Sequence, residues 1–201
     1  SMGTRGHLGG LSEATQGAVK ILDLYGADYI FIETVGVGQS EVDIVKTCDT
    51  TVMVMVPGLG DDIQAIKAGV MEIGDVFAVN KADRDGAKRM AREIEMMLDF
   101  SHSEWRPPVE LVVAVEDKGV DELLGHIESH REYMVKSGNF EKRRINNSKY
   151  EIIGLLQQKL MKVLFDKSNK EELVEKLSVE VAQRKLDPYT ASNDIFNQIN
   201  R

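Results

Sequence analysis

A carboxylate and a glycine follow an apolar run near the start of the sequence, and these residue types could bind a phosphate group together with a metal ion. Glu33 comes directly after the apolar residues 29–32, and Gly36 follows three residues later. A carboxylate at the end of a buried strand can hold a hydrated Mg²⁺, and a glycine there lets its backbone N–H approach a γ-phosphate. The pair predicts a segment that orders when a triphosphate binds. The alternative is a glutamate that caps a glycine-rich turn.

A second polar motif, Asn80-Lys81-x-Asp83, directly follows the apolar residues 76–79. An aspartate at a strand end can accept hydrogen bonds from N1–H and the 2-amino group of guanine, which adenine cannot supply in the same pattern. The asparagine would brace the adjoining loop, and the lysine stem would pack along the base. The motif alone is weak evidence, because polar residues often follow strands. Its occurrence after the Glu33 segment favours a guanine-nucleotide site.

Alternating apolar runs and helical patterns supply the elements that would position these residues. Between the runs, apolar residues recur at helical spacing, for example at Ala87, Met90, Ala91 and Ile94. Strands that are apolar throughout and separated by amphipathic helices predict an α/β fold with a parallel sheet covered on both faces. The runs predicted to be strands are residues 29–32, 51–56, 76–79 and 109–114.

The composition changes near residue 137, after which no strand-like run occurs. We predict a domain at residues 1–137 that carries both polar motifs and a helical arm at residues 138–201. Pro188 lies where a proline favours the first turn of a last helix. The arm also carries an apolar stripe that would need to be covered, either by the α/β domain or by a second subunit. The stripe comprises Ile152, Leu156, Leu160, Val163 and Leu164.

Composition and charge exclude several classes of protein. The 201 residues carry a net charge of −8, which argues against a general nucleic-acid binder. The single cysteine, Cys48, excludes an internal disulfide framework and any site built from several cysteines. No apolar run has the length of a membrane span, and the first residues do not resemble a signal peptide. We therefore expect a cytoplasmic or organelle-matrix location.

Two polar groups near the middle of the chain have ordinary interpretations. His126 and His130 are four residues apart on one predicted helix, a spacing that could bind a metal, but no further ligand pattern accompanies them. We interpret them as surface histidines. The basic residues 142–144 are interpreted as a solvated patch at a helix start.

Longer motifs resemble one known family of GTPases. Residues 2–10, 32–41, 56–69 and 80–83 are similar to the P-loop G-protein chaperones of adenosylcobalamin-dependent acyl-CoA mutases. This is the MeaB and human MMAA type, also labelled ArgK or LAO/AO transport-system ATPase/kinase. The resemblance covers the whole chain and implies a three-layer P-loop NTPase-type sheet with a helical arm. It also implies GTP or GDP and Mg²⁺ as cofactors, a mutase as partner, and a homodimer formed through the arm.

The resemblance assigns roles to individual residues. Glu33 and Gly36 would lie at the Mg²⁺ and γ-phosphate switch, with Glu33 as the metal ligand. Asn80, Lys81 and Asp83 would recognise guanine. The loop with Ala114 and Val115 would touch the base through its backbone, although the side-chain hydroxyl usual there is absent. Asp61 and Lys67 would be charged contacts of a further switch loop that senses the mutase, and Asp61 could also cap a helix.

Two departures from the family pattern change the expected activity. The phosphate-binding motif G-x-x-x-x-G-K-[ST] does not occur in the sequence. We therefore expect this chain to be the C-terminal part of a longer GTPase, weak in nucleotide binding and inactive by itself. Val37 stands where many GTPases have a glutamine that orients water, which predicts slow hydrolysis. The alternative functions are an ATPase or kinase linked to amino-acid transport and a non-catalytic module that binds partners.

Overall fold

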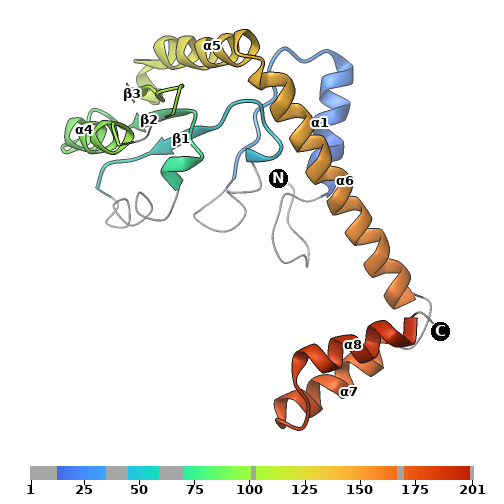
Figure 1. Ribbon diagram of the computed structural model, residues 1–201. Coiled ribbons are helices and arrows are strands. Elements are labelled where there is room, and N and C mark those ends of the chain that lie inside the picture. The colour runs from blue at the N-terminus through green and yellow to red at the C-terminus, as the bar shows by residue number, and fades with distance from the viewer. Residues whose placement is uncertain (1–12, 35–44, 59–69, 101–102, 167–169, 200–201) are drawn as a thin grey trace. The chain divides into compact units, whose positions relative to one another are not determined.

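The computed structural model describes residues 13–34, 45–58, 70–100, 103–166 and 170–199 (Figure 1). The chain divides into two units, Ser1–Asn147 and Ser148–Arg201. The predicted boundary at residue 137 and the roles predicted for the two parts remain predictions. In chain order the elements are α1 (Glu13–Tyr25), β1 (Val52–Met55), η1 (Val70–Glu72), β2 (Val76–Asn80), α4 (Ala87–Leu98), β3 (Val109–Val112), η2 (Ala114–Glu116), α5 (Val120–Lys136), α6 (Asn139–Asp166), α7 (Lys170–Ala182) and α8 (Pro188–Ile199).

The first unit contains a parallel sheet of the order β1-β2-β3, as the alternation of apolar runs predicted. Val52 pairs with Val76 at the start of β1, and Asn80 pairs with Val112 at the end of β2. Val76, Phe77, Ala78 and Val79 are all buried. Because successive side chains point to opposite faces, β2 must be covered on both sides, as expected for a parallel sheet.

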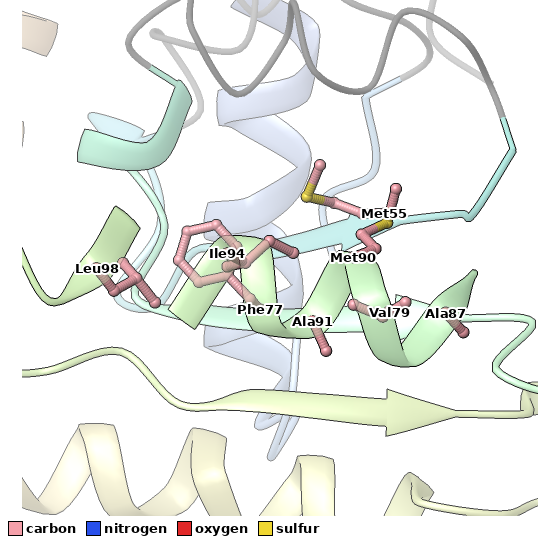
Figure 2. Packing of buried hydrophobic residues seen from close by; sticks show 8 residues of the cluster. All are labelled: Met55, Phe77, Val79, Ala87, Met90, Ala91, Ile94 and Leu98. Carbon is pink, nitrogen blue, oxygen red and sulfur yellow. The ribbon is translucent and has the colours of Figure 1, made fainter. Parts of the chain in front are cut away.

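Helix α4 covers one face of the sheet and forms the main apolar core. Its buried residues recur at intervals of three or four and pack on Met55, Phe77 and Val79 (Figure 2). Phe77 and Ile94 are fully buried at the centre of this cluster. The predicted apolar stripe of this helix is confirmed. The residues that α4 contributes are Ala87, Met90, Ala91, Ile94 and Leu98.

Helix α5 contacts β2 and β3, and one of its buried residues corrects a prediction. His130 is 1% exposed, so it is a buried residue and does not lie on the surface. The reason is its spacing, because positions 120, 123, 127, 130 and 134 fall on one face of the helix. The histidine thus occupies a core position, and Met134 is buried one turn later.

Residues 29–32 were predicted to form a strand, and this prediction is wrong. The structure assigns no strand to this segment, and Phe31 remains 84% exposed. Among the described residues no strand pairs with it, and a strand is defined by such a ladder of hydrogen bonds to a neighbour. On β1, which pairs with β2 along one edge, Val54 is likewise exposed although it is apolar.

The described part of the second unit consists of the rest of α6, then α7 and α8, with residues 183–187 forming the turn between the last two helices. Helices α7 and α8 pack against each other. Asp187 caps α8, because its Oδ1 accepts hydrogen bonds from the N–H groups of Tyr189 and Thr190 at 2.9 and 3.0 Å. Pro188 is the first residue of the helix, as predicted. Across the described part of the chain, every helix is too short or too polar to cross a bilayer.

Gly119 is required where the loop after β3 leads into α5. Its φ is +74°, and a Cβ built there would lie 2.3 Å from the carbonyl oxygen of Leu111. We expect Gly119→Ala to lower the free energy of unfolding by more than about 1 kcal/mol, because the left-handed backbone and the clash both disfavour a side chain. Urea denaturation of the chain would measure the change.

The matched control for this substitution is Gly125→Ala in the middle of α5. A Cβ at Gly125 meets nothing within 4 Å. This variant should gain roughly 0.5–1 kcal/mol, because alanine favours the helix. Equal effects of the two substitutions would contradict the role given to Gly119.

Candidate functional site

The predicted base-binding residues gather where β2 and β3 end. In a parallel sheet the carboxyl ends of neighbouring strands meet at one edge, and ligands commonly bind there. Asn80 is the last residue of β2, and Ala114 begins the short turn η2 after β3. These two residues are 34 positions apart in the sequence, and a hydrogen bond connects them. The topology therefore brings the two predicted base-binding segments into one place.

Asn80 organises this edge through its side-chain oxygen. The Oδ1 atom accepts hydrogen bonds from the backbone N–H of Lys81 at 2.7 Å and of Ala114 at 3.2 Å. The N–H of Ala82 also donates to the carbonyl of Val112 at 3.0 Å. One carboxamide thus joins the turn after β2 to the loop after β3, and its predicted role toward a bound base stays a prediction.

The turn after β2 presents Lys81 and Asp83 to solvent. Lys81 has a φ of 59°, which is rare for a residue with a side chain. Its carbonyl accepts a hydrogen bond from the N–H of Arg84, which closes the turn at 3.0 Å. Asp83 is exposed, so its carboxylate is accessible to an incoming hydrogen-bond donor. A backbone held in an unusual conformation beside an accessible carboxylate is typical of a ligand-binding turn.

The loop after β3 is closed by paired backbone hydrogen bonds. The N–H of Val113 donates to the carbonyl of Lys118 at 2.9 Å, and the reverse bond measures 3.3 Å. This closure leaves Ala114 exposed at the tip, and Val115 is 94% exposed. Exposed backbone and an exposed apolar side chain could contact the flat surface of a base, in line with the contacts expected of this loop.

Lys118 belongs to the same edge, and the motifs of the sequence did not point to it. Its ammonium pairs with Glu116, whose hydrogen bond and charge raise the lysine pKa, and the charge of Asp83 adds to that effect. The lysine therefore lies in the electrostatic range of the carboxylate predicted to bind guanine. The signal that could have found it is Gly119, which marks the tight turn at which the loop ends.

The remaining predicted site residues are not brought into this edge by the described structure. Glu33 is exposed, and no described interaction connects it with Asn80 or its neighbours. Gly36, Asp61 and Lys67 lie outside the described residues. Among the residues with defined positions, no three His, Cys, Asp or Glu side chains form a metal-binding group. One carboxylate suits Mg²⁺ only when phosphate oxygens and water complete its coordination.

Comparison with known proteins identifies the family. Residues 1–169 match the family described as "Methylmalonyl Co-A mutase-associated GTPase MeaB". The chain belongs to this family. The Pyrococcus abyssi protein named "Putative GTPase" is 47% identical and aligns with 99% of the chain and 63% of its own length. The chain thus spans less than two thirds of that relative.

Two further proteins are similar to this chain, one in sequence and one in fold. The Caenorhabditis elegans protein named "Methylmalonic aciduria type A homolog, mitochondrial" is 31% identical over 96% of the chain and 50% of its own length. A solved structure described as "Crystal structure of LAO/AO transport system kinase" has a TM-score of 0.74 and 24% identity. It aligns with 92% of this chain and 62% of its own. The α/β fold with a parallel sheet and C-terminal helices that the sequence predicted is confirmed.

We expect Asn80→Ala to destabilise the chain by about 0.5–1.5 kcal/mol, because two N–H donors lose their shared acceptor. The free energy of unfolding in urea is the measurement. Asn80→Asp is the matched control, because it keeps an acceptor oxygen in place and should retain most of the stability. A loss as large in the aspartate variant as in the alanine variant would show that the acceptor is not what Asn80 contributes.

Proposed function

We propose that this chain is the guanine-recognising part of a GTPase that serves a cobalamin-dependent acyl-CoA mutase as a chaperone. The observation that carries the proposal is the Asn80 carboxamide, which holds the turn with Lys81 and Asp83 beside the loop with Ala114. In the complete protein, GTP binding and hydrolysis would gate the delivery of the cofactor to the mutase or its protection there. The mutase partner rests on the description of the family.

Each residue would contribute a different part of this function. Asp83 would accept hydrogen bonds from the guanine edge, and the stem of Lys81 would lie along the ring. The backbone of Ala114 and Val115 would meet the base from the other strand end. Glu33 would hold Mg²⁺ together with phosphate oxygens, and the metal would neutralise developing charge on the transferred phosphoryl group.

Three residues of the proposal lie outside the described part of the chain. Gly36 would donate its backbone N–H to the γ-phosphate, and Asp61 and Lys67 would contact the mutase. A cytoplasmic or organelle-matrix location belongs to the same proposal, and the mitochondrial relative supports the latter.

A second candidate is an ATPase or kinase, favoured by the similar fold of the protein called a LAO/AO transport system kinase. The exposed Asp83 carboxylate argues for guanine, because adenine lacks the adjacent N1–H and 2-amino donors that one carboxylate can accept together. A third candidate is a module that only binds partners. Titration of labelled GDP and ATP distinguishes the three: preference for GDP supports the GTPase, preference for ATP supports the kinase, and binding of neither by the extended polypeptide supports the module.

The role of Asp83 predicts a change of nucleotide preference. In the polypeptide extended to the length of its relatives, Asp83→Asn should weaken GTP binding by about tenfold or more relative to XTP, since the amide offers a donor where guanine needs an acceptor. Competition binding measures the ratio. Asp85→Asn, which changes an exposed carboxylate of the same turn, should leave it unaltered. An unaltered ratio in the Asp83 variant would remove this residue from base recognition.

We further propose that the arm mediates a homodimer. The apolar stripe of α6 is largely exposed within the single chain, with Ile152, Leu156, Leu160 and Val163 each more than half exposed. Full burial of such a side chain contributes about 1.5–3 kcal/mol, which is enough in sum to hold two chains together after ordering costs. The side chain of Leu164, also predicted in the stripe, lies outside the described residues.

The dimer can be tested with charged substitutions on and off the stripe. Leu156→Asp combined with Leu160→Asp should yield a monomer in light scattering, because two charges cannot be buried at an apolar contact. Gln157→Asp combined with Gln158→Asp adds the same charge away from the stripe and should remain dimeric. Circular dichroism would check that both variants fold. An unmodified chain that is monomeric at micromolar concentration would contradict the proposal.

A further inference from the structure

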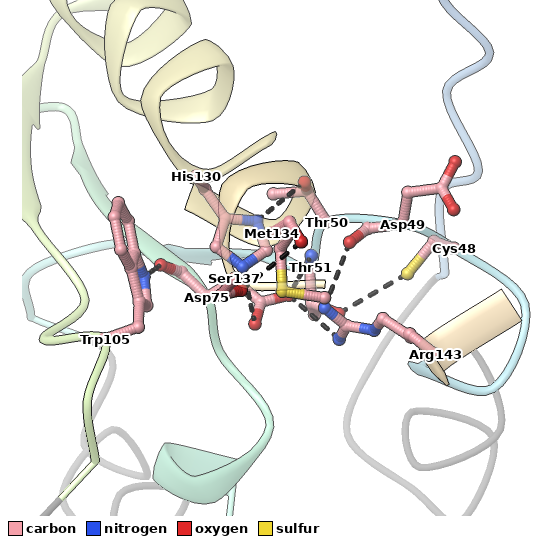
Figure 3. Close-up of polar contacts among 10 residues, drawn as sticks. All are labelled: Cys48, Asp49, Thr50, Thr51, Asp75, Trp105, His130, Met134, Ser137 and Arg143. Atoms are coloured by element: carbon pink, nitrogen blue, oxygen red, sulfur yellow. Dashed lines mark hydrogen bonds and ion pairs between the residues drawn. The ribbon is translucent and has the colours of Figure 1, made fainter. Parts of the chain in front are cut away.

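Asp75 connects several elements at the edge of the sheet opposite to the base-binding residues. It precedes β2, and its Oδ2 accepts a hydrogen bond from the N–H of Thr51 at 2.8 Å. The same oxygen forms an ion pair with Arg143 Nη2 at 3.0 Å. His130 Nε2 lies 3.4 Å from its Oδ1. The Trp105 indole N–H donates to its backbone carbonyl at 2.8 Å (Figure 3). One residue thus contacts groups from α5, α6 and the segments before β1 and β3.

His130 is held in this cluster as a neutral ring. Its Nδ1 lies 2.9 Å from the hydroxyl of Thr50, and its ring packs on that of Trp105 at 5.1 Å between centroids. Burial lowers the pKa of His130 and the charge of Arg143 adds to this, while Asp75 opposes them. In a neutral ring with its proton on Nε2, the Nε2–H faces Asp75 and Nδ1 accepts a hydrogen bond from the Thr50 hydroxyl. Both ring nitrogens then have partners.

Two arginines at the start of α6 bind the loop before β1. Arg143 Nη1 donates to the carbonyl of Asp49 at 3.0 Å, and Arg144 forms two hydrogen bonds of 3.2 and 3.1 Å to the Asp49 carboxylate. The Arg144 guanidinium also lies over the ring of Phe140, 4.6 Å from its centroid. The prediction that residues 142–144 form a solvated patch is wrong for Arg143, whose side chain is only 17% exposed, while Lys142 and Arg144 are exposed as predicted.

We propose that Asp75, His130 and Arg143 form a latch that holds the first turns of α6 against loop 46–51, and that protonation of His130 opens it. The two cationic partners compete for one carboxylate. When His130 is neutral, no second cation in the cluster draws on the charge of Asp75, and Arg143 also reaches the Asp49 carbonyl with its other nitrogen. When His130 is charged, the repulsion between two buried cations weakens the hold of Arg143.

The latch is a local device, separate from the core on the other face of the sheet. The apolar cluster under α4 contains none of its members. Loss of the latch should therefore release loop 46–51 and the start of α6 together while β2 and α4 keep their structure. Arg143 and Asp49 are 94 positions apart, so their hydrogen bond joins two distant segments of the chain. Loss of a residue that only fills space would affect its immediate neighbours and would not release both segments together.

Hydrogen exchange followed by mass spectrometry tests this coupling on the chain as it exists. Arg143→Gln should reduce protection of the amides in residues 46–51 and 139–147 together, by roughly tenfold or more. Protection of β2 and α4 should not change. Arg89→Gln, which breaks the exposed pair of Arg89 with Glu93 on α4, is the matched control and should leave both segments protected. Loss confined to α6, or spread over β2 and α4 as well, would overturn the latch.

The pH dependence supplies a second readout that does not require the Arg143 variant to fold. The pKa of His130 is lower in the closed latch than in the open chain, where the ring is exposed to water. Acidification through the interval between the two pKa values therefore favours the open latch. At about pH 5 the unaltered chain should lose protection in both segments relative to about pH 7.5, after correction for intrinsic exchange. His130→Gln cannot gain this charge, so its protection should be independent of pH in this range. The same pH response in both proteins would overturn the role of His130.

Discussion

Burial of strand β2 on both faces is the constraint on which the rest of the first unit depends. Val76 to Val79 have almost no exposed surface, so α4 and α5 must lie on opposite sides of this strand. Such a strand can carry polar chemistry only at its ends, because a polar side chain within it would be buried without a partner. Asp75 and Asn80 are the residues at those two ends, and each binds groups from a neighbouring segment.

The two ends use polar side chains under different conditions. At the carboxyl end, Asn80 is part-exposed and pairs with backbone N–H groups, so Lys81 and Asp83 remain accessible to a ligand. At the amino end, His130 is buried and the Asp75 side chain is only 18% exposed, so the charge of Asp75 must be balanced by groups within the protein. An accessible end suits reversible binding, and a shielded end suits a connection that holds elements together. Strand β2 therefore has the predicted base-binding residues at its carboxyl end and the contacts that hold loop 46–51 and α6 at its amino end.

Prediction from the sequence succeeded where a pattern of neighbouring residues determines the structure. It failed where the structure depends on contacts between residues far apart in the chain. The run before Asn80 and the stripe of α4 are periodic patterns, and the structure has them where the patterns predicted. His130 was predicted to lie on the surface because histidine is a polar residue type. Its spacing from the apolar residues of α5 instead fits the buried face of that helix. Arg143 was misjudged because its partners are far away in the sequence, so its charge alone indicated solvent. Residues 29–32 have the propensity of a strand, but a strand also requires a neighbour.

The position of loop 46–51 in the chain relates the latch to the proposed function. The loop follows the segment of Glu33 in sequence and leads directly into β1, so its backbone connects the predicted phosphate-sensing residues with the sheet. Arg143 and Arg144 bind the same loop from α6, the helix whose later turns carry the exposed apolar stripe. A shift of the loop would change the distances on which both arginine contacts depend. Asp49 and Asp75 accept these arginine contacts, so the first turns of α6 are joined through them to the loop and to the start of β2.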